Sequence, residues 1–149
     1  MKLIILIFII SIDQLTKYII NQNLPVNAKY KLLNFLDIVN IHNKGISFGL
    51  FSNLLPSLLI SFIVFLVILL IIYWYWRSKN NFEKWSLTFL LAGGIGNLID
   101  RMVNQYVVDF IYINYEQYYW PAFNVADISI TIGIILLIIC AYINYKYRL

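Results

Sequence analysis

The feature that most constrains this chain is a series of four long apolar stretches, at residues 3–20, 54–76, 85–101 and 124–145. A helix of about 20 apolar residues, within a range of roughly 17 to 25, crosses the hydrocarbon layer of a bilayer. The chain is 62% hydrophobic and 12% charged, whereas a soluble domain is about half apolar and about a quarter charged. We therefore expect one integral membrane domain over residues 1–149, mainly α-helical, with four transmembrane helices.

Positive side chains predict the orientation of these helices. Six Lys or Arg lie at the N-terminus, in the segment 77–84 and in the C-terminal tail, and four lie in or beside segments 21–53 and 102–123. Because Lys and Arg favour the cytoplasmic side, we expect both termini in the cytoplasm and these two segments as outer loops. A cleaved signal peptide is disfavoured, because the first apolar run is followed by Asp13, Gln14 and Lys17 rather than small residues.

The outer loops differ in composition. The first partly alternates apolar and polar residues from Phe35 to Ile41, which predicts short strands on the membrane surface. The second is shorter and rich in Tyr. Nothing resembles the basic and aromatic pattern of a nucleic-acid groove, so no nucleic-acid partner is expected. With one cysteine, Cys140, and one histidine, His42, we expect no metal site, no internal disulfide and no cofactor.

Charged and amide side chains gather at the predicted outer ends of the apolar stretches. Charged groups inside a span are costly, so each is a candidate functional residue. Residues three or four apart share one helix face, and a depth of 1.5 Å per residue places the whole set at one level. The set comprises Asp13, Lys17, Asn97, Asp100, Arg101, Asp109, Asn124 and Asp127.

Ion pairing accounts for two of the four aspartates. We expect Asp13 to pair with Lys17 at i+4, and Asp100 to pair with Arg101 or Lys44. These three polar positions are therefore predicted to be structural: Asp13, Lys17 and Asp100.

Asp109 and Asp127 have no obvious local cation and lie among apolar neighbours, in "VVDFIY" and "NVADIS". If two carboxyl groups lie close together in such surroundings, one keeps its proton and the pair titrates as a unit. The ionised member can take a proton from water while the other polarises a carbonyl. The pair therefore suggests peptide hydrolysis with no metal and no covalent intermediate. A Ser–His–Asp arrangement has little support, because the single histidine lies in the outer loop.

Five motifs in order along the chain resemble those of bacterial lipoprotein signal peptidase, also called signal peptidase II, an aspartic peptidase family. "DQLTK" resembles the family's first-span motif, and "HNKGISFGLF" resembles N-x-G-x-x-F through Asn43, Gly45 and Phe48. "GGIGNLIDR" resembles G-N-x-x-D-R. "VVDFI" and "FNVADISI" resemble the segments with the catalytic aspartates. One position departs, since Ile128 stands where the family usually has Ser.

This resemblance implies a site and a reaction. Asp109 and Asp127 would be catalytic, and a set of residues would support them or bind substrate: Asn43, Gly45, Asn97, Arg101 and Asn124. A β-rich first loop would form a cradle, and a further outer loop or short helix would cover the site. The substrate would be a prolipoprotein carrying diacylglyceryl-cysteine, cut just before that cysteine. We also expect a multi-pass protein of the bacterial inner membrane, with its site near the outer face. We further expect contact with membrane lipid, binding of a globomycin-type inhibitor, and a monomeric state.

Two other classes of function compete with this one. A small proton-coupled transporter or channel also places aspartates in the membrane, but it needs polar groups through the full depth, and the inner halves of these spans are almost bare. A non-catalytic scaffold would use the aspartates to join helices, and would tolerate Asp→Asn at both Asp109 and Asp127.

Overall fold

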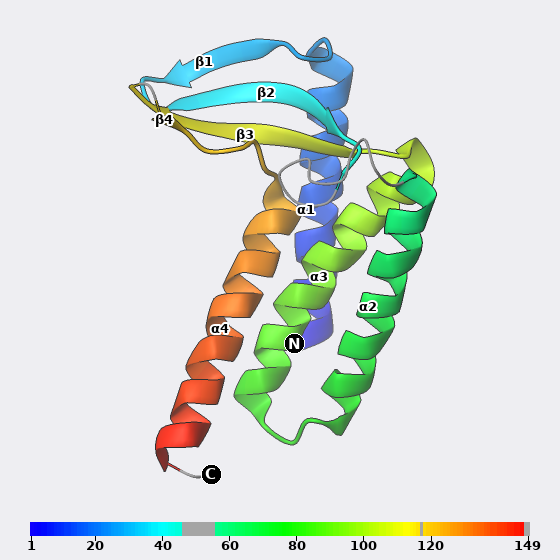
Figure 1. The fold of residues 1–149 in the computed structure, drawn as a ribbon, viewed down its shortest axis with the longest axis vertical. Helices are drawn as coiled ribbons and strands as arrows, with labels where there is room; N and C mark the ends of the chain where they lie inside the picture. The colour runs from blue at the N-terminus through cyan, green and yellow to red at the C-terminus, as the bar shows by residue number, and fades with distance from the viewer. Residues whose placement is uncertain (46–55, 117, 148–149) are drawn as a thin grey trace.

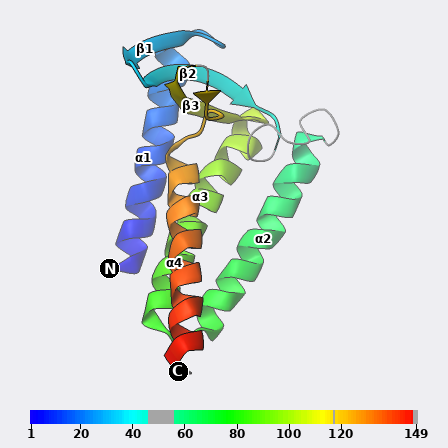
Figure 2. The same cartoon turned by 60° about the vertical axis from the view of Figure 1, so that its left-hand side comes forward.

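The computed structural model describes residues 1–45, 56–116 and 118–147 as a bundle of long helices with a small sheet across one end (Figure 1). The elements, in chain order, are α1 Lys2–Asn23, β1 Lys29–Leu33, β2 Leu36–Asn43, α2 Ser57–Arg77, α3 Asn81–Asn104, β3 Val107–Tyr115, β4 Tyr118–Tyr119 and α4 Val125–Tyr147. The start of α1 and the end of α4 both point away from the sheet (Figure 2).

Among the described residues, three helices are long and apolar enough to cross a membrane: α1, α2 and α4. Along α1 only Asp13 and Lys17 are buried, so most of its apolar side chains face the surroundings, as expected of a helix in lipid. Three of the four predicted spans therefore have the required length and composition.

The third predicted span lies on α3, which is long enough but less apolar. This helix packs against α1, α2 and α4, and it buries polar side chains such as Asn97, Asp100 and Arg101. Hydropathy is therefore lowest in the helix that the other three surround. A fourth crossing remains a prediction.

Glycines bring α3 and α4 close together. A Cβ at Gly93 would clash with the carbonyl oxygen of Ala126, and one at Gly133 would lie 2.9 Å from the backbone nitrogen of Leu90. Small residues allow such contact between helices in lipid. This contact fixes the first turn of α4, with Asp127, beside the polar end of α3.

The sheet is antiparallel, with strand order β1-β2-β3-β4. The predicted strands in the first loop are confirmed as β1 and β2. The alternative of a short helix in the second outer loop is wrong for the part of that loop that the structure describes, which forms β3 and β4. The run "VVDFIYINY" is rich in β-branched and aromatic residues, which favour strands. In the register of β2 and β3, Ile41 pairs with Asp109 and Asn43 with Val107.

Candidate active site

Asp109 lies on β3 and is 3% exposed. Its two carboxylate oxygens accept hydrogen bonds from two amides, at 2.9 Å from Nδ2 of Asn43 and at 2.7 Å from Nδ2 of Asn124. Burial, and then the negative charge of Asp127, raise the pKa of Asp109 to about 7, although the two amide hydrogen bonds oppose this rise. A carboxyl group with this pKa can hold a proton near neutral pH.

Asp127 lies in the first turn of α4 and is half-buried. It accepts hydrogen bonds from Nδ2 of Asn97 at 2.8 Å and from the backbone N–H of Asn124 at 3.2 Å. At the N-terminal end of a helix, free backbone N–H groups carry partial positive charge. The two aspartates therefore have different surroundings.

Asn124 connects the two carboxyl groups. Its Nδ2 donates to Asp109, and its Oδ1 accepts the backbone N–H of Asp127 at 2.9 Å, as an N-cap of α4. One buried amide thus links the first residues of β3 to the start of α4. The same side chain therefore contacts Asp109 and caps the helical turn that carries Asp127.

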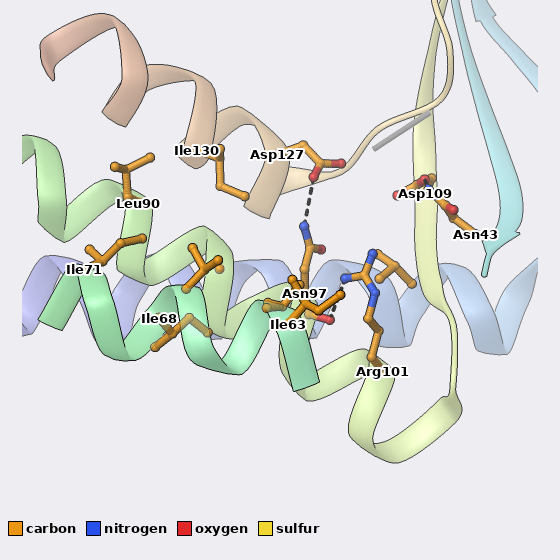
Figure 3. A pocket seen from close by; sticks show the side chains of 14 residues that line it. Asn43, Ile63, Ile68, Ile71, Leu90, Asn97, Arg101, Asp109, Asp127 and Ile130 are labelled. Atoms are coloured by element: carbon orange, nitrogen blue, oxygen red, sulfur yellow. Dashed lines mark hydrogen bonds between the residues drawn. The ribbon is translucent and has the colours of Figure 1, made fainter. Parts of the chain in front are cut away.

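Both aspartates line one cavity of about 340 Å³. Figure 3 shows Asp127 and Asp109 at its polar end, with α2 along its side. The polar residues of the lining are Asn43, Asn97, Arg101, Asp109 and Asp127. The rest is almost entirely apolar: Ile63, Val64, Val67, Ile68, Ile71, Leu90, Gly94, Val107 and Ile130. The cavity can therefore hold a long apolar group whose polar end reaches the acids.

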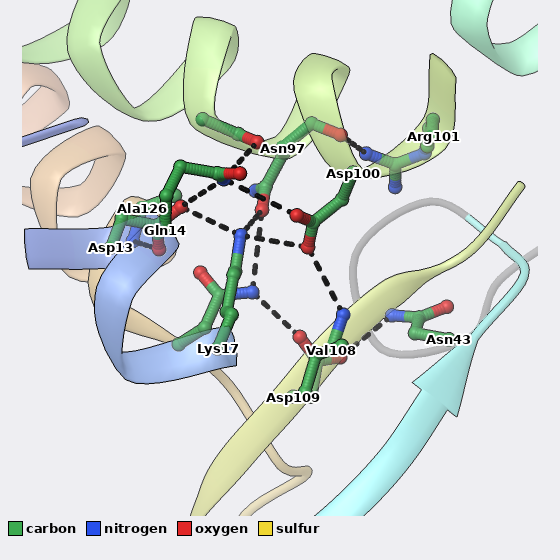
Figure 4. Close-up of polar contacts among 12 residues, drawn as sticks. Asp13, Gln14, Lys17, Asn43, Asn97, Asp100, Arg101, Val108, Asp109 and Ala126 are labelled. Carbon is green, nitrogen blue, oxygen red and sulfur yellow. Dashed lines mark hydrogen bonds and ion pairs between the residues drawn. The ribbon is translucent and has the colours of Figure 1, made fainter. Parts of the chain in front are cut away.

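Lys17 lies at the centre of a buried polar network that joins α1 to α3 (Figure 4). Its Nζ lies 2.8 Å from Oδ2 of Asp13, 3.1 Å from Oδ2 of Asp100 and 2.9 Å from Oδ1 of Asn97. The predicted pair of Asp13 and Lys17 is present. The predicted partner of Asp100 was wrong, because Lys17 occupies that place rather than Arg101 or Lys44.

Arg101 holds backbone rather than a carboxylate. Its Nη2 donates to the carbonyl oxygen of Gly45 at 2.8 Å, and its Nη1 donates to that of Asn97 at 3.2 Å. The N–H of Gly45 in turn donates to Oδ1 of Asn43 at 2.9 Å. Asn43 is thereby oriented with its amide nitrogen toward Asp109, so the predicted supporting residues Asn43, Gly45, Asn97, Arg101 and Asn124 all lie around the acids.

Sequence reasoning missed Gln14. Its Nε2 lies within 3.2 Å of carboxylate oxygens of Asp13 and Asp100 and 3.1 Å from the carbonyl oxygen of Gly96. Its place in "DQLTK", next to Asp13, was the available signal.

At the departure from the family motif, Ile128 is 39% exposed, and the following Ser129 donates to the carbonyl oxygen of Phe89 at 2.8 Å.

Apolar helices around a cavity with two carboxyl groups at one end are the arrangement of a membrane-embedded hydrolase of the aspartic type. Among the described residues, no group of three or more His, Cys, Asp or Glu is placed to hold a metal ion.

Comparison with known proteins gives the family. Residues 5–143 match the family described as signal peptidase (SPase) II. The chain is 41% identical to a lipoprotein signal peptidase of Thermodesulfovibrio yellowstonii, over 93% of this chain and 90% of that protein. It is 40% identical to a lipoprotein signal peptidase of Staphylococcus haemolyticus, over 93% and 88%. The chain belongs to the signal peptidase II family.

Solved structures agree with this assignment. One bacterial membrane enzyme, solved at 2.3 Å resolution, superposes with a TM-score of 0.90 at 32% identity, over 99% of this chain and 91% of that one. A second, solved at 1.9 Å, gives a TM-score of 0.83 at 34% identity, over 94% and 91%. The predicted family and its peptidase activity are confirmed, so the chain is a protease of the hydrolase class with membrane-spanning helices. The transporter alternative finds no support.

Proposed function

We propose that this enzyme removes signal peptides from diacylglyceryl-modified prolipoproteins, with Asp109 and Asp127 as its catalytic pair. One observation carries the proposal: both carboxyl groups line the same cavity, and that cavity is otherwise apolar. A water molecule between the acids would meet a scissile bond whose apolar neighbours occupy the rest of the space.

The different surroundings of the two acids suggest their roles. Asp109, with its raised pKa, carries the shared proton and donates a hydrogen bond to the scissile carbonyl oxygen. Asp127, at the helix N-terminus, acts as the base that takes a proton from the attacking water. The hydroxyl oxygen bonds to the carbonyl carbon, the peptide nitrogen then receives a proton, and the C–N bond breaks. No covalent intermediate with the protein forms.

Asn43, Asn97 and Asn124 position the two carboxylates through the hydrogen bonds described above. Gly45 and Arg101 act through Asn43, because they fix the backbone beside it. Asp13, Lys17 and Asp100 are structural, since they form a buried ion network that holds Asn97.

The apolar lining suits a substrate that arrives from the bilayer. Side chains from α2 form most of it, and acyl chains or the apolar signal peptide would lie against them. The proposal includes four crossings, with α3 as the fourth, in one domain over residues 1–149. Both termini are cytoplasmic, and the acids lie near the outer face of a bacterial inner membrane. The enzyme acts as a monomer among membrane lipids, and a globomycin-type inhibitor would occupy the cavity.

A cleavage assay tests the proposal. Purified protein in detergent or lipid receives a diacylglyceryl-modified prolipoprotein, with and without chelator, beside Asp109→Asn and Asp127→Asn variants. We expect cleavage just before the lipidated cysteine, unaffected by chelator, and loss of at least about 10³-fold in each variant. Cleavage by either variant at the parent rate would reject the catalytic pair and favour a role for the aspartates in joining helices. Inhibition by chelator would indicate a metalloenzyme.

A further inference from the structure

A second pocket of about 510 Å³ lies at the corner where β2 ends, β3 begins, and α2 and α3 approach the sheet. Three short segments line it: His42 and Lys44 at the end of β2, Pro56 and Ser57 at the start of α2, and residues 104–106 between α3 and β3. Apart from Pro56, these residues offer polar groups or a polar-tipped ring. This polar pocket therefore differs from the cavity that contains Asp109 and Asp127, whose lining is mostly apolar.

The walls of this polar pocket are fixed by specific contacts. The ring of His42 stacks on that of Tyr106, with centroids 3.7 Å apart and planes 12° from parallel. Nε2 of His42 lies 3.0 Å from Oδ1 of Asn21. The hydroxyl of Ser57 donates to the carbonyl oxygen of Gln105 at 2.6 Å, which joins α2 to the turn after α3. These contacts hold the residues that line the polar pocket in place.

The polar pocket lies next to the cavity that contains Asp109 and Asp127, at two points along the chain. His42 and Lys44 flank Asn43, which lines the cavity and donates to Asp109. Tyr106 immediately precedes Val107, another residue of the cavity. Residues that are neighbours in the chain therefore line the two hollows, at the end of β2 and at the start of β3.

Helix α2 runs past both hollows. Its residues from Ile71 to Ile63 line the cavity, and Ser57, about 9 Å further along the helix axis, lines the polar pocket. A chain lying along α2 would therefore pass apolar side chains, then the two acids, then polar groups. This order matches a substrate that is apolar before its cleavage point and polar after it.

We infer that the polar pocket binds the first residues after the lipidated cysteine, and that Lys44 favours an acidic side chain there. The inference rests on the proposed function. Lys44 is exposed, and within the described parts of the chain it makes no ion pair, so its charge is available to a ligand. Burial and the nearby Lys44 lower the pKa of His42, so Lys44 supplies the positive charge of the pocket near pH 7.

Charge reversal at both partners tests the inference. Three lipid-modified substrates differ only at the second residue after the cysteine, which is Glu, Gln or Lys. They are given to the parent, to Lys44→Glu, and to Lys31→Glu as a matched control. Lys31 is exposed on β1, where it pairs with Asp37 at the end of β2 far from Asn43.

We expect the parent to cleave the Glu substrate with a higher kcat/KM than the Lys substrate. In Lys44→Glu this preference should reverse, with a total change of roughly five- to tenfold, because exposed charges interact weakly. The change should lie mainly in KM, and the Gln substrate should fall between the Glu and Lys substrates in the parent. If the ratio of kcat/KM between the Glu and Lys substrates were unchanged in Lys44→Glu, or changed equally in Lys31→Glu, the proposed subsite would be rejected while the proposed function would stand. If the parent cleaved none of the three substrates, the proposed function would fall as well.

Discussion

Replacement of Asn124 by Ser separates two tasks that one side chain performs. Asn124 caps α4 by accepting the N–H of Asp127 at 2.9 Å, and it donates to Asp109 at 2.7 Å. Ser is also a good N-cap, but its shorter side chain does not extend to Asp109. Asn124→Ser should therefore keep the cap and lose the link to the acid, whereas Asn124→Ala should lose both.

The size of each effect follows from these bonds. Loss of the cap in Asn124→Ala should lower the free energy of unfolding by about 1 kcal/mol relative to Asn124→Ser. A hydrogen bond to a charged group is worth about 1.5–3 kcal/mol, and one pH unit of pKa corresponds to about 1.36 kcal/mol. The hydrogen bond from Asn124 stabilises the ionised form of Asp109. Its loss should therefore raise the pKa of Asp109 above about 7 by roughly one further pH unit. Misplacement of the acid should lower kcat by about 10²-fold.

The assay is cleavage of lipid-modified substrate from pH 5 to pH 9, with thermal unfolding measured on the same samples. The parent should lose activity as pH rises through about 7, because Asp109 then loses the proton that it donates. In Asn124→Ser the remaining activity should persist to higher pH, by about one pH unit. A parental kcat in Asn124→Ser would show that the residue only caps the helix. A shift of the alkaline limb to lower pH would refute the electrostatic reasoning.

Three further predictions concern stability. The pKa of Asp109 is about 7 in the folded protein, above its ordinary value of 3.8, so its contribution to stability is full below pH 3.8 and is lost as pH rises through 7. Between pH 5 and pH 8 the free energy of unfolding of the parent should therefore fall by about 2 kcal/mol more than that of Asp109→Asn, as measured by thermal or denaturant unfolding. An equal dependence of stability on pH in the two proteins would contradict this. Lys17→Met leaves buried carboxylates unpaired and should lower the free energy of unfolding by about 3–5 kcal/mol. Lys31→Met, at an exposed side chain on β1 with no ion pair among the described residues, should leave the unfolding midpoint almost unchanged; equal losses in the two variants would contradict a role for burial. Gly93→Ala would place a methyl group against the backbone carbonyl of Ala126 and should lower the free energy of unfolding by about 1–3 kcal/mol. Gly94→Ala, with its nearest neighbour at 3.4 Å, should leave the unfolding midpoint unchanged or higher, and the reverse order would refute the close packing of α3 and α4.

Much of the fold could be predicted, because apolar runs of spanning length carry a strong signal. The limits of α1, α2 and α4 differ from the predicted spans by a few residues. The status of α3 was harder to predict, because a helix surrounded by three others can bury polar groups that lower its hydropathy. The strand β3 was not assigned from the Tyr-rich loop, since its pairing partner β2 lies far away in sequence.

The candidate site was predicted as a set of residues, but its connections were not. Helical spacing correctly paired Asp13 with Lys17, since both lie on one helix. It could not show that Lys17 also reaches Asp100 on another helix, because spacing describes only local neighbours. The same limit hid Gln14, whose partners on α3 appear only after the helices pack.

The choice of amides around the two acids has a physical consequence. Asp109 and Asp127 receive side-chain hydrogen bonds from Asn43, Asn97 and Asn124. Within the described residues, neither acid forms an ion pair with Lys or Arg. A neutral donor fixes a carboxylate without supplying a full opposing charge, whereas an adjacent cation would lower its pKa by about 1–3 pH units. Lys17 is occupied by Asp13 and Asp100 instead, and Arg101 by backbone oxygens. Both acids thus line one cavity, and Asp109 can keep a proton near neutral pH, as the proposed acid–base cleavage of a peptide bond requires.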